Sequence, residues 1–194
     1  AVIVDAGIRE MMVEQKDAFY YVTLMNENYA QPDVPEGAAA DILRGCYRFG
    51  VYAPASGKAK EKVTLMGSGA ILTEVIKAAQ MLADEGIEAE VFSVTSWSEL
   101  ARDGLACEQR ALAGEEAGVP FVAQQLGKGR APIIAATDYV RALPESVRAF
   151  LPEGRRYLTL GTDGFGRSDT RAALRRFFGV DAASIAKAAR FAMT

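Results

Sequence analysis

Histidine is absent from the 194 residues of this chain, and its absence excludes several kinds of catalytic site. Histidine is the usual general acid or base near neutral pH and the commonest side-chain ligand of metals. Ser-His-Asp and Cys-His catalysis within the chain are therefore excluded, and a catalytic zinc site is disfavoured. An enzyme built from this sequence would have to use carboxylates, lysines or tyrosines.

Cysteine is nearly absent as well, since Cys46 and Cys107 are the only two. They show neither the spacing of a metal site nor a CxxC motif. We therefore expect two reduced thiols in a cytoplasmic protein rather than a structural disulfide. The first residues lack the basic region and cleavage site of a signal peptide, and no apolar run reaches the roughly 20 residues of a membrane span. A membrane partner is not expected.

A strong positive charge is also missing. The formal net charge is −3, and lysine and arginine are spread along the chain without a polybasic run. Nucleic acid is therefore not an expected partner, because its phosphates reward a basic surface. Hydrophobic residues make up 50% of the chain, which is ordinary for a globular domain and enough to form one core.

Strand-like and helix-like segments alternate along the chain. Apolar and β-branched runs predict strands at residues 19–25, 47–53, 63–66, 89–94, 121–124, 133–136 and 156–160. Apolar spacing and helix-start signals predict helices at residues 3–15, 38–46, 70–85, 97–101, 107–113, 144–150, 168–178 and beyond 181. Because short connections join these elements, we expect an α/β fold with a mostly parallel sheet and helices on both faces.

Several residues mark where the predicted helices begin and end. Ser96, Ser168 and Asp181 are the expected N-caps, because each can accept a hydrogen bond from the first helical turn. Gly86 and Gly179 are placed where helices stop, since glycine readily takes the left-handed conformation of a C-terminal cap.

Residues 26–37, with the sequence NENYAQPDVPEG, fit no regular element. Pro32, Pro35 and Gly37 interrupt both helices and strands there. We therefore predict a linker that separates a short helix–strand stub, residues 1–25, from the main domain, residues 38–194.

The turn Gly67-Ser68-Gly69 joins a predicted strand to a predicted helix. Such a turn can present backbone N–H groups to a phosphate. The dinucleotide fingerprint, however, requires a third glycine where this chain has Leu72, and an acid at the end of the next strand. We therefore favour a turn that allows close packing of strand and helix over an NAD site.

A second glycine-rich segment, GTDGFGRSD, spans residues 161–169 between a strand and a helix. Loops at the carboxyl ends of strands are where open α/β sheets place ligands and partners. A ligand or interface loop is one interpretation, and a plain turn with Phe165 as a plug and an Arg167–Asp169 pair is the other. The candidate interface residues are Gly161, Asp163, Gly164, Phe165, Gly166 and Arg167.

The segment SWSELARDG, residues 96–104, holds the only tryptophan. Trp97 is expected to anchor the core or an interface rather than to bind substrate. Glu99, Arg102 and Asp103 lie at i, i+3 and i+4 on a predicted helix, which favours a solvated cluster of ion pairs.

Five long motifs give the chain a family resemblance. They are FYYVTLMNENY, VTLMGSGAIL, EVFSVTSWSELARDG, TDYV and LGTDGFGRSDTR. In this order they resemble the C-terminal region of the bacterial homodimeric pyruvate dehydrogenase (acetyl-transferring) component, of the transketolase-like thiamine diphosphate family. The resemblance extends over about residues 19–189. It implies a mixed, mostly parallel sheet like that of transketolase C-terminal domains, and residues 1–25 then resemble the last helix and strand of a pyrimidine-binding domain.

The resemblance also implies a function for the parent enzyme. Such an enzyme decarboxylates pyruvate on thiamine diphosphate with magnesium and reductively acetylates a lipoyl group. Its partners would be the preceding domains, a homodimer partner and the dihydrolipoyl acetyltransferase core. The role implied for this segment is structural, in dimer assembly and at the border of the active site.

This chain departs from the cofactor-binding pattern of the family. The thiamine diphosphate motif begins with Gly-Asp-Gly and ends with paired asparagines, whereas this chain has only Arg102-Asp103-Gly104 and Thr162-Asp163-Gly164. We therefore assign no catalytic, cofactor-binding or metal residue here. Two alternatives remain open: a small-anion-binding module that uses residues 67–69 or 161–169, and a histidine-free enzyme that works with carboxylates.

Overall fold

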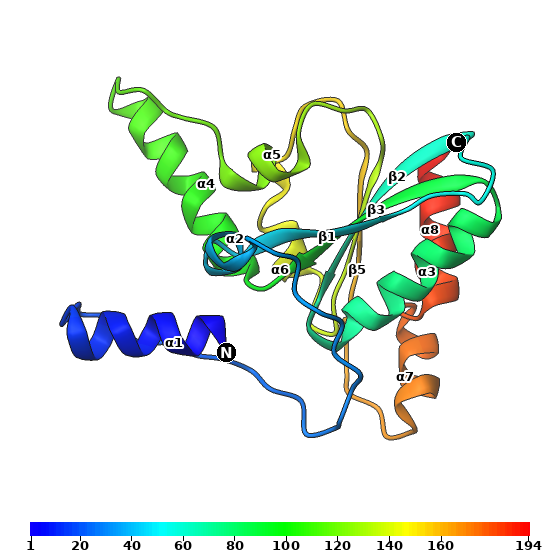
Figure 1. The fold of residues 1–194 in the computed structure, drawn as a ribbon, viewed down its shortest axis with the longest axis horizontal. Helices are drawn as coiled ribbons and strands as arrows, with labels where there is room; N and C mark the ends of the chain where they lie inside the picture. Colours follow the sequence, from blue (N-terminus) through cyan, green and yellow to red (C-terminus); the bar gives the residue numbers. More distant parts are fainter.

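A computed structural model describes all 194 residues and is built around one sheet. The sheet has five strands in the order β1-β3-β2-β4-β5 (Figure 1). Only β1 is antiparallel to its neighbour, and the other three pairings are parallel. The expected mostly parallel, mixed sheet is confirmed. The strands are β1 Cys46–Tyr52, β2 Glu61–Ser68, β3 Ile87–Val94, β4 Ile133–Ala136 and β5 Tyr157–Leu160.

Each face of the sheet carries its own buried core, and helices cover both (Figure 1). On one face, Val63 and Leu65 pack among residues of α3 (Leu72–Asp84) and α8 (Ala182–Met193). On the other, alternate residues of the same strands pack against α4 Trp97–Leu112, α5 Phe121–Leu126, α6 Ala142–Glu145 and the 3-10 turn η3 Arg148–Phe150. Burial on both faces explains why the strands are continuous apolar runs.

Three helix boundaries follow the predicted signals. The Ser96 hydroxyl accepts from the Glu99 N–H at 3.2 Å at the start of α4. The Asp181 carboxylate accepts from the Ser184 N–H at 3.1 Å at the start of α8. Gly179, at φ 69°, takes the left-handed conformation that ends a helix.

The predicted start of α7 was wrong by two residues. This helix spans Arg171–Phe178 and is capped by Thr170, whose hydroxyl accepts from the Ala173 N–H at 3.3 Å. Ser168 therefore stays in the preceding loop. A capping residue has an extended backbone directly before the first helical residue, and Thr170, at ψ 150°, has this conformation next to Arg171.

The predicted strand at residues 19–25 is wrong. Helix α1 (Val2–Ile8) and the π-helical turn η1 (Arg9–Val13) form, but the chain then runs without regular structure until the short helix α2 (Ala39–Leu43). A strand needs a neighbour to complete its hydrogen bonds. No strand of the sheet pairs with residues 19–25, so their apolar pattern has no ladder to join.

The predicted strand at residues 121–124 is also wrong, because this run belongs to helix α5. Pro120 precedes the helix, and the Phe121 N–H donates to the Asp103 carboxylate of α4 at 2.5 Å. That distant acceptor satisfies the helix start in the way a local cap would. A short apolar run cannot by itself distinguish a strand from a buried helix.

The predicted helix at residues 144–150 is divided. Helix α6 ends at Glu145 and the 3-10 turn η3 begins at Arg148. Pro144 lies at the third position of α6 instead of the first, still within the first turn, where its missing N–H has no intrahelical partner to lose.

Both cysteines are buried and free, and burial raises the pKa of the Cys46 thiol well above its ordinary value. None of the helices combines the length and the apolar character that crossing a bilayer requires.

Candidate functional site

The carboxyl ends of β2, β4 and β5 converge at one edge of the sheet. The Ser68 hydroxyl, at the end of β2, donates to the Thr137 hydroxyl after β4 at 2.9 Å in a buried contact. The Thr162 hydroxyl, after β5, donates to the Asp138 carbonyl oxygen at 2.6 Å. The two predicted glycine-rich segments are therefore brought to the same place.

This edge is a topological switch point. Strands β2 and β4 are parallel neighbours, but the chain leaves them toward opposite faces of the sheet. Helix α3 follows β2 onto one core, whereas Leu143 and Val147 follow β4 onto the other. The diverging connections leave a crevice between the strand ends, which is where open α/β sheets bind ligands.

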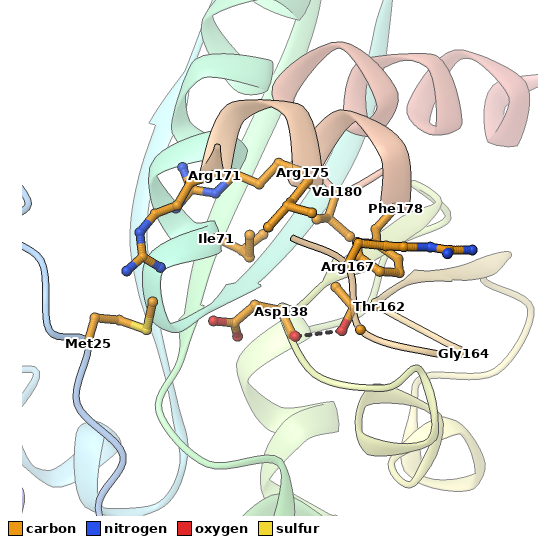
Figure 2. A pocket seen from close by; sticks show the side chains of 12 residues that line it. Met25, Ile71, Asp138, Thr162, Gly164, Arg167, Arg171, Arg175, Phe178 and Val180 are labelled. Carbon is orange, nitrogen blue, oxygen red and sulfur yellow. Dashed lines mark hydrogen bonds between the residues drawn. The ribbon is translucent and has the colours of Figure 1, made fainter. Parts of the chain in front are cut away.

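A cavity of about 270 Å³ lies at the switch point (Figure 2). Its apolar side consists of Ile71, Val180 and two residues of α7, and Met25 of the N-terminal segment also lines it. Its polar side consists of Asp138, Thr162, two loop glycines and three arginines. The full lining is Met25, Ile71, Asp138, Thr162, Gly164, Gly166, Arg167, Arg171, Leu174, Arg175, Phe178 and Val180.

Asp138 is the acidic group of the cavity. Burial raises the pKa of its carboxyl above the ordinary value, and its own backbone N–H and the nearby Arg175 oppose this effect in part. No side chain of another residue donates a hydrogen bond to this carboxylate. Asp138 therefore faces the cavity without a side-chain partner.

The three arginines of the cavity differ in what holds them. Arg175 donates to the Glu74 carboxylate at 3.1 Å and to the Tyr29 hydroxyl at 3.0 Å. Arg171 forms an ion pair with Glu27 and donates to the Asn26 side chain at 2.9 Å. Arg167 has no carboxylate partner and lies over the Phe177 ring, 5.3 Å from its centre.

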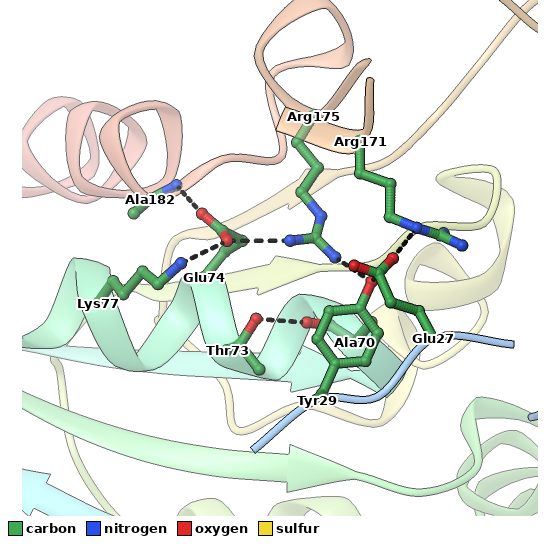
Figure 3. A network of polar contacts seen from close by, with 9 residues as sticks. All are labelled: Glu27, Tyr29, Ala70, Thr73, Glu74, Lys77, Arg171, Arg175 and Ala182. Carbon is green, nitrogen blue, oxygen red and sulfur yellow. Dashed lines mark hydrogen bonds and ion pairs between the residues drawn. The ribbon is translucent and has the colours of Figure 1, made fainter. Parts of the chain in front are cut away.

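Glu74 is the centre of the polar network beside the cavity (Figure 3). Its carboxylate accepts from Lys77 at 3.0 Å, from Arg175 at 3.1 Å and from the Ala182 backbone N–H at 3.1 Å. Because Arg175 also holds Tyr29, the network joins α3, α7, the start of α8 and the N-terminal segment. Three donors satisfy the buried Glu74 carboxylate, so its role is to hold these elements together.

The first half of loop 161–169 is packed tightly. A Cβ atom added at Gly161 would lie 2.7 Å from the Tyr139 carbonyl oxygen, so only glycine fits there. The Asp163 carboxylate accepts from the Arg141 backbone N–H at 2.9 Å and from its Nε at 2.6 Å. These contacts, the backbone N–H first, lower the pKa of the Asp163 carboxyl.

The second half of the loop is open. Phe165 is 91% exposed, so the interpretation of this side chain as a plug is wrong. The Arg167–Asp169 pair does not form either: Asp169 accepts from the Thr170 N–H at 2.6 Å, and Arg167 lies over the Phe177 ring. Gly164 takes φ +91°, and Gly166 has open space around it. Gly164, Gly166 and Arg167 line the cavity, whereas Phe165 does not.

Other predicted residues have structural roles. Trp97 is buried in the second core, as expected of an anchor. Glu99 and Arg102 form the predicted ion pair, but Asp103 caps α5 instead of joining that cluster. A Cβ atom added at Gly67 would lie 2.8 Å from the Val75 side chain, which confirms the close-packing interpretation of that turn.

Asp138, Arg171 and Arg175 were missed by reasoning from the sequence. The signal was present, because Asp138 directly follows a predicted strand end and the two arginines lie at i and i+4 on a predicted helix. In this structure no group of three or more Cys, Asp or Glu side chains is placed to hold a metal ion.

Comparisons with known proteins agree on one family. The model of the transketolase-like TK C-terminal domain matches residues 50–181, and that of the pyruvate dehydrogenase E1 component middle domain matches residues 1–32. The chain is 47% identical over 184 residues to the pyruvate dehydrogenase E1 component of Pseudomonas aeruginosa, covering 93% of the chain and 20% of the relative. For that of Escherichia coli K12, identity is 45% over 193 residues, with 97% and 21% covered. The chain thus spans about a fifth of the length of these relatives.

Solved structures of transketolases share the fold. A transketolase mutant from Pichia stipitis superposes with a TM-score of 0.52 at 16% sequence identity, covering 83% of this chain and 20% of that one. A second transketolase structure from the same organism gives 0.50 at 14%, with the same coverage. At these identities the likeness concerns the fold alone.

Proposed function

The chain belongs to the transketolase-like C-terminal domain family, and from this premise we propose that it serves as the C-terminal domain of a pyruvate dehydrogenase E1 enzyme. The whole enzyme would decarboxylate pyruvate on thiamine diphosphate and transfer the acetyl group reductively to a lipoyl group. The observation that carries the proposal is 47% identity across 93% of the chain to a protein of that name. Two family models in consecutive order support it.

The proposed domain boundaries keep the organisation predicted from the sequence: a stub at residues 1–25, a linker at 26–37 and the C-terminal domain at 38–194. The match of the middle-domain model to residues 1–32 supports a stub that belongs to the preceding domain. The exposure of Phe19, Tyr21 and Leu24, at 87–88%, supports it further. Large apolar side chains of this kind are suited to packing against another domain.

The residues of this chain do not fit the cofactor of the proposed enzyme. Magnesium bound to a diphosphate takes oxygen ligands from the protein, and the acidic side chains here are not grouped to supply them. The Gly-Asp-Gly and paired-asparagine pattern is missing as well. We therefore assign no catalytic step to this chain, and the cofactor would be held by other parts of the enzyme.

The proposed role of the chain is assembly of a homodimer, with loop 161–169 at the contact. Its exposed Phe165 offers an apolar anchor, and Arg167 offers donors suited to a carboxylate or a carbonyl oxygen. The tight contacts of Gly161 and Asp163 would hold the loop in position. Further proposed partners are the preceding domains and the dihydrolipoyl acetyltransferase core, in the cytoplasm.

The proposed activity is tested on the full-length protein and on the 194-residue chain separately. With thiamine diphosphate and magnesium, the full-length protein should decarboxylate pyruvate. Calorimetry should detect no micromolar binding of thiamine diphosphate to the chain alone. Tight binding to the chain would refute our assignment of the cofactor, and a full-length protein inactive on pyruvate would refute the proposed reaction.

The proposed interface is tested by Phe165→Ala in the full-length protein. The dimer should weaken by about 1–3 kcal/mol, the usual scale for an interface anchor, while turnover per remaining dimer stays unchanged. Leu112→Ala is the matched control, because Leu112 is 89% exposed at the end of the protruding α4, far from the loop (Figure 1). Equal weakening by both variants, or a loss of turnover with an intact dimer, would contradict the interface assignment.

A further inference from the structure

The cavity at the switch point has the composition of a ligand site, and most of its lining lies outside the proposed interface loop. We propose that it binds a small phosphate monoester that carries a hydroxyl group. The phosphate takes the place of Glu27 on Arg171, and the hydroxyl donates to Asp138.

The position of the cavity is typical of a ligand site. It lies at the carboxyl ends of parallel strands, between connections that leave toward opposite faces of the sheet. Backbone and side-chain groups from three separate strand ends converge there, and such crevices are the general ligand sites of open α/β sheets. A volume of about 270 Å³ is at the small end of the range for ligand pockets, which restricts the ligand to a small molecule.

The arginines of the cavity differ in how readily they can bind a ligand. Arg175 is committed to Glu74, since both side chains are largely buried, at 16% and 10% exposure. Arg171 is paired with Glu27 on the irregular N-terminal segment, and both side chains are about half exposed. An exposed pair of this kind is weak, so a phosphate can displace Glu27 from Nε. If it also displaces Asn26 from the second nitrogen, it takes both donors of the guanidinium fork.

The balance of charge indicates a dianion. Three arginines and one aspartate line the cavity, which leaves an excess of two positive charges once Glu27 is displaced. Glu74 does not cancel this excess, because Lys77 neutralises it as well as Arg175. A phosphate monoester carries close to two negative charges near neutral pH, whereas a carboxylate carries one.

Asp138 explains why the ligand should carry a hydroxyl group. Its carboxylate faces the same opening as the Arg171 guanidinium and the Met25 side chain (Figure 2). It accepts no hydrogen bond from another side chain of the protein, so a donor on the ligand would satisfy it. Inorganic phosphate has no carbon-bound hydroxyl group that could donate to Asp138. If inorganic phosphate itself lay beside Asp138, the two negative charges would repel each other.

The test measures binding of glycerol 3-phosphate to the full-length protein by calorimetry, with glycerol and inorganic phosphate as comparison ligands. Glycerol 3-phosphate should bind saturably and more tightly than either. Arg171→Gln should weaken binding about tenfold or more, because a charge-assisted contact is lost. Arg190→Gln is the matched control. Arg190 lies on α8 outside the cavity, is as exposed as Arg171 and is likewise paired with a glutamate, Glu85.

Glu27→Gln gives the decisive result, because removal of the competing carboxylate should tighten binding, a gain that misfolding cannot produce. Asp138→Ala, which removes the acceptor, should remove most of the preference for glycerol 3-phosphate over inorganic phosphate. The proposal is overturned if glycerol 3-phosphate does not bind, if Arg171→Gln and Arg190→Gln behave alike, or if Glu27→Gln leaves the affinity unchanged. None of these results depends on pyruvate turnover or on the dimer, so they leave the proposed function untouched.

Discussion

Two regions of the chain have apolar sequences, but one buries its large apolar side chains and the other leaves several of them exposed. In the sheet domain, Phe92 is 1% exposed and Leu65 is fully buried. In the N-terminal segment, Phe19 is 88% exposed and Leu24 is 87% exposed. The difference is one of partners, because each sheet strand has neighbouring strands and covering helices, whereas the run at residues 19–25 pairs with no strand and only Tyr20 packs on a helix, at Gly7 of α1. Hydrophobic patterning thus specifies a face that can be buried, and the rest of the fold decides whether burial occurs.

Removing one aromatic ring from each region should give very different losses of stability. Phe92→Ala should lower the free energy of unfolding by about 3–5 kcal/mol, because it leaves a cavity in a closed core. Phe19→Ala should change it by no more than about 0.5 kcal/mol, since the ring is already in solvent. Urea unfolding of the 194-residue chain measures both. Similar losses for the two variants would mean that the N-terminal segment is packed after all.

The polar network of Glu74, which links the two regions, is expected to give the next largest effect. Glu74→Gln should destabilise the chain by about 3 kcal/mol, because it leaves the largely buried Arg175 without its counter-charge. Glu85→Gln is the control, and its loss should stay below about 1 kcal/mol because the Glu85–Arg190 pair is exposed. Thermal and urea unfolding test the ranking, and a smaller loss for Glu74→Gln than for Glu85→Gln would contradict it.

Within the sheet domain, loop 161–169 repeats the contrast between packed and open residues on a smaller scale. Gly161→Ala should cost about 1–3 kcal/mol, because the added Cβ atom would collide with the Tyr139 carbonyl oxygen. Gly166→Ala should be close to neutral, since nothing lies near that position and its backbone needs no positive φ. Chemical denaturation of both variants is the measurement, and equal costs would show that the loop is uniformly packed or uniformly open.

The smallest effect is expected where the N-terminal segment is tied to α7. Tyr29→Phe removes the hydroxyl that accepts from Arg175, a contact worth about 1 kcal/mol or less. Amide exchange at residues 26–30 should become faster, while exchange in β3 and the global free energy of unfolding stay the same. In the unmodified chain, residues 14–25 should already exchange much faster than β3. Protection of those residues in a monomer would show that the N-terminal segment is packed as firmly as the sheet domain, contrary to expectation.

The accuracy of the sequence predictions follows the range of the forces involved. The strands at residues 63–66 and 133–136 and the caps Ser96 and Asp181 were predicted correctly, because local pattern and chemistry determine them. Residues 121–124 were misassigned because their helix is capped by Asp103, which lies 18 residues earlier. The strand at residues 19–25 failed because a strand needs a partner that no local pattern can provide.

The candidate site was predicted in part for the same reason. The two glycine-rich segments were identified and each was placed between a strand and a helix, but their meeting at one edge of the sheet was not predicted. Sequence signals existed for Asp138 and for the Arg171–Arg175 spacing separately, but their convergence at one cavity depends on the tertiary placement of α7. Neighbours that are distant in sequence are set by the topology of the sheet.

The Glu27–Arg171 contact has a further consequence for how the cavity would respond to a ligand. Glu27 is tethered to the chain, so its effective concentration beside the guanidinium is on the order of millimolar. A free anion competes against this built-in rival, and its apparent affinity falls in proportion to the time that Arg171 is occupied. Because the Glu27–Arg171 pair is exposed and weak, Glu27 would lower the apparent affinity for an anion by about a few-fold and would not block the cavity.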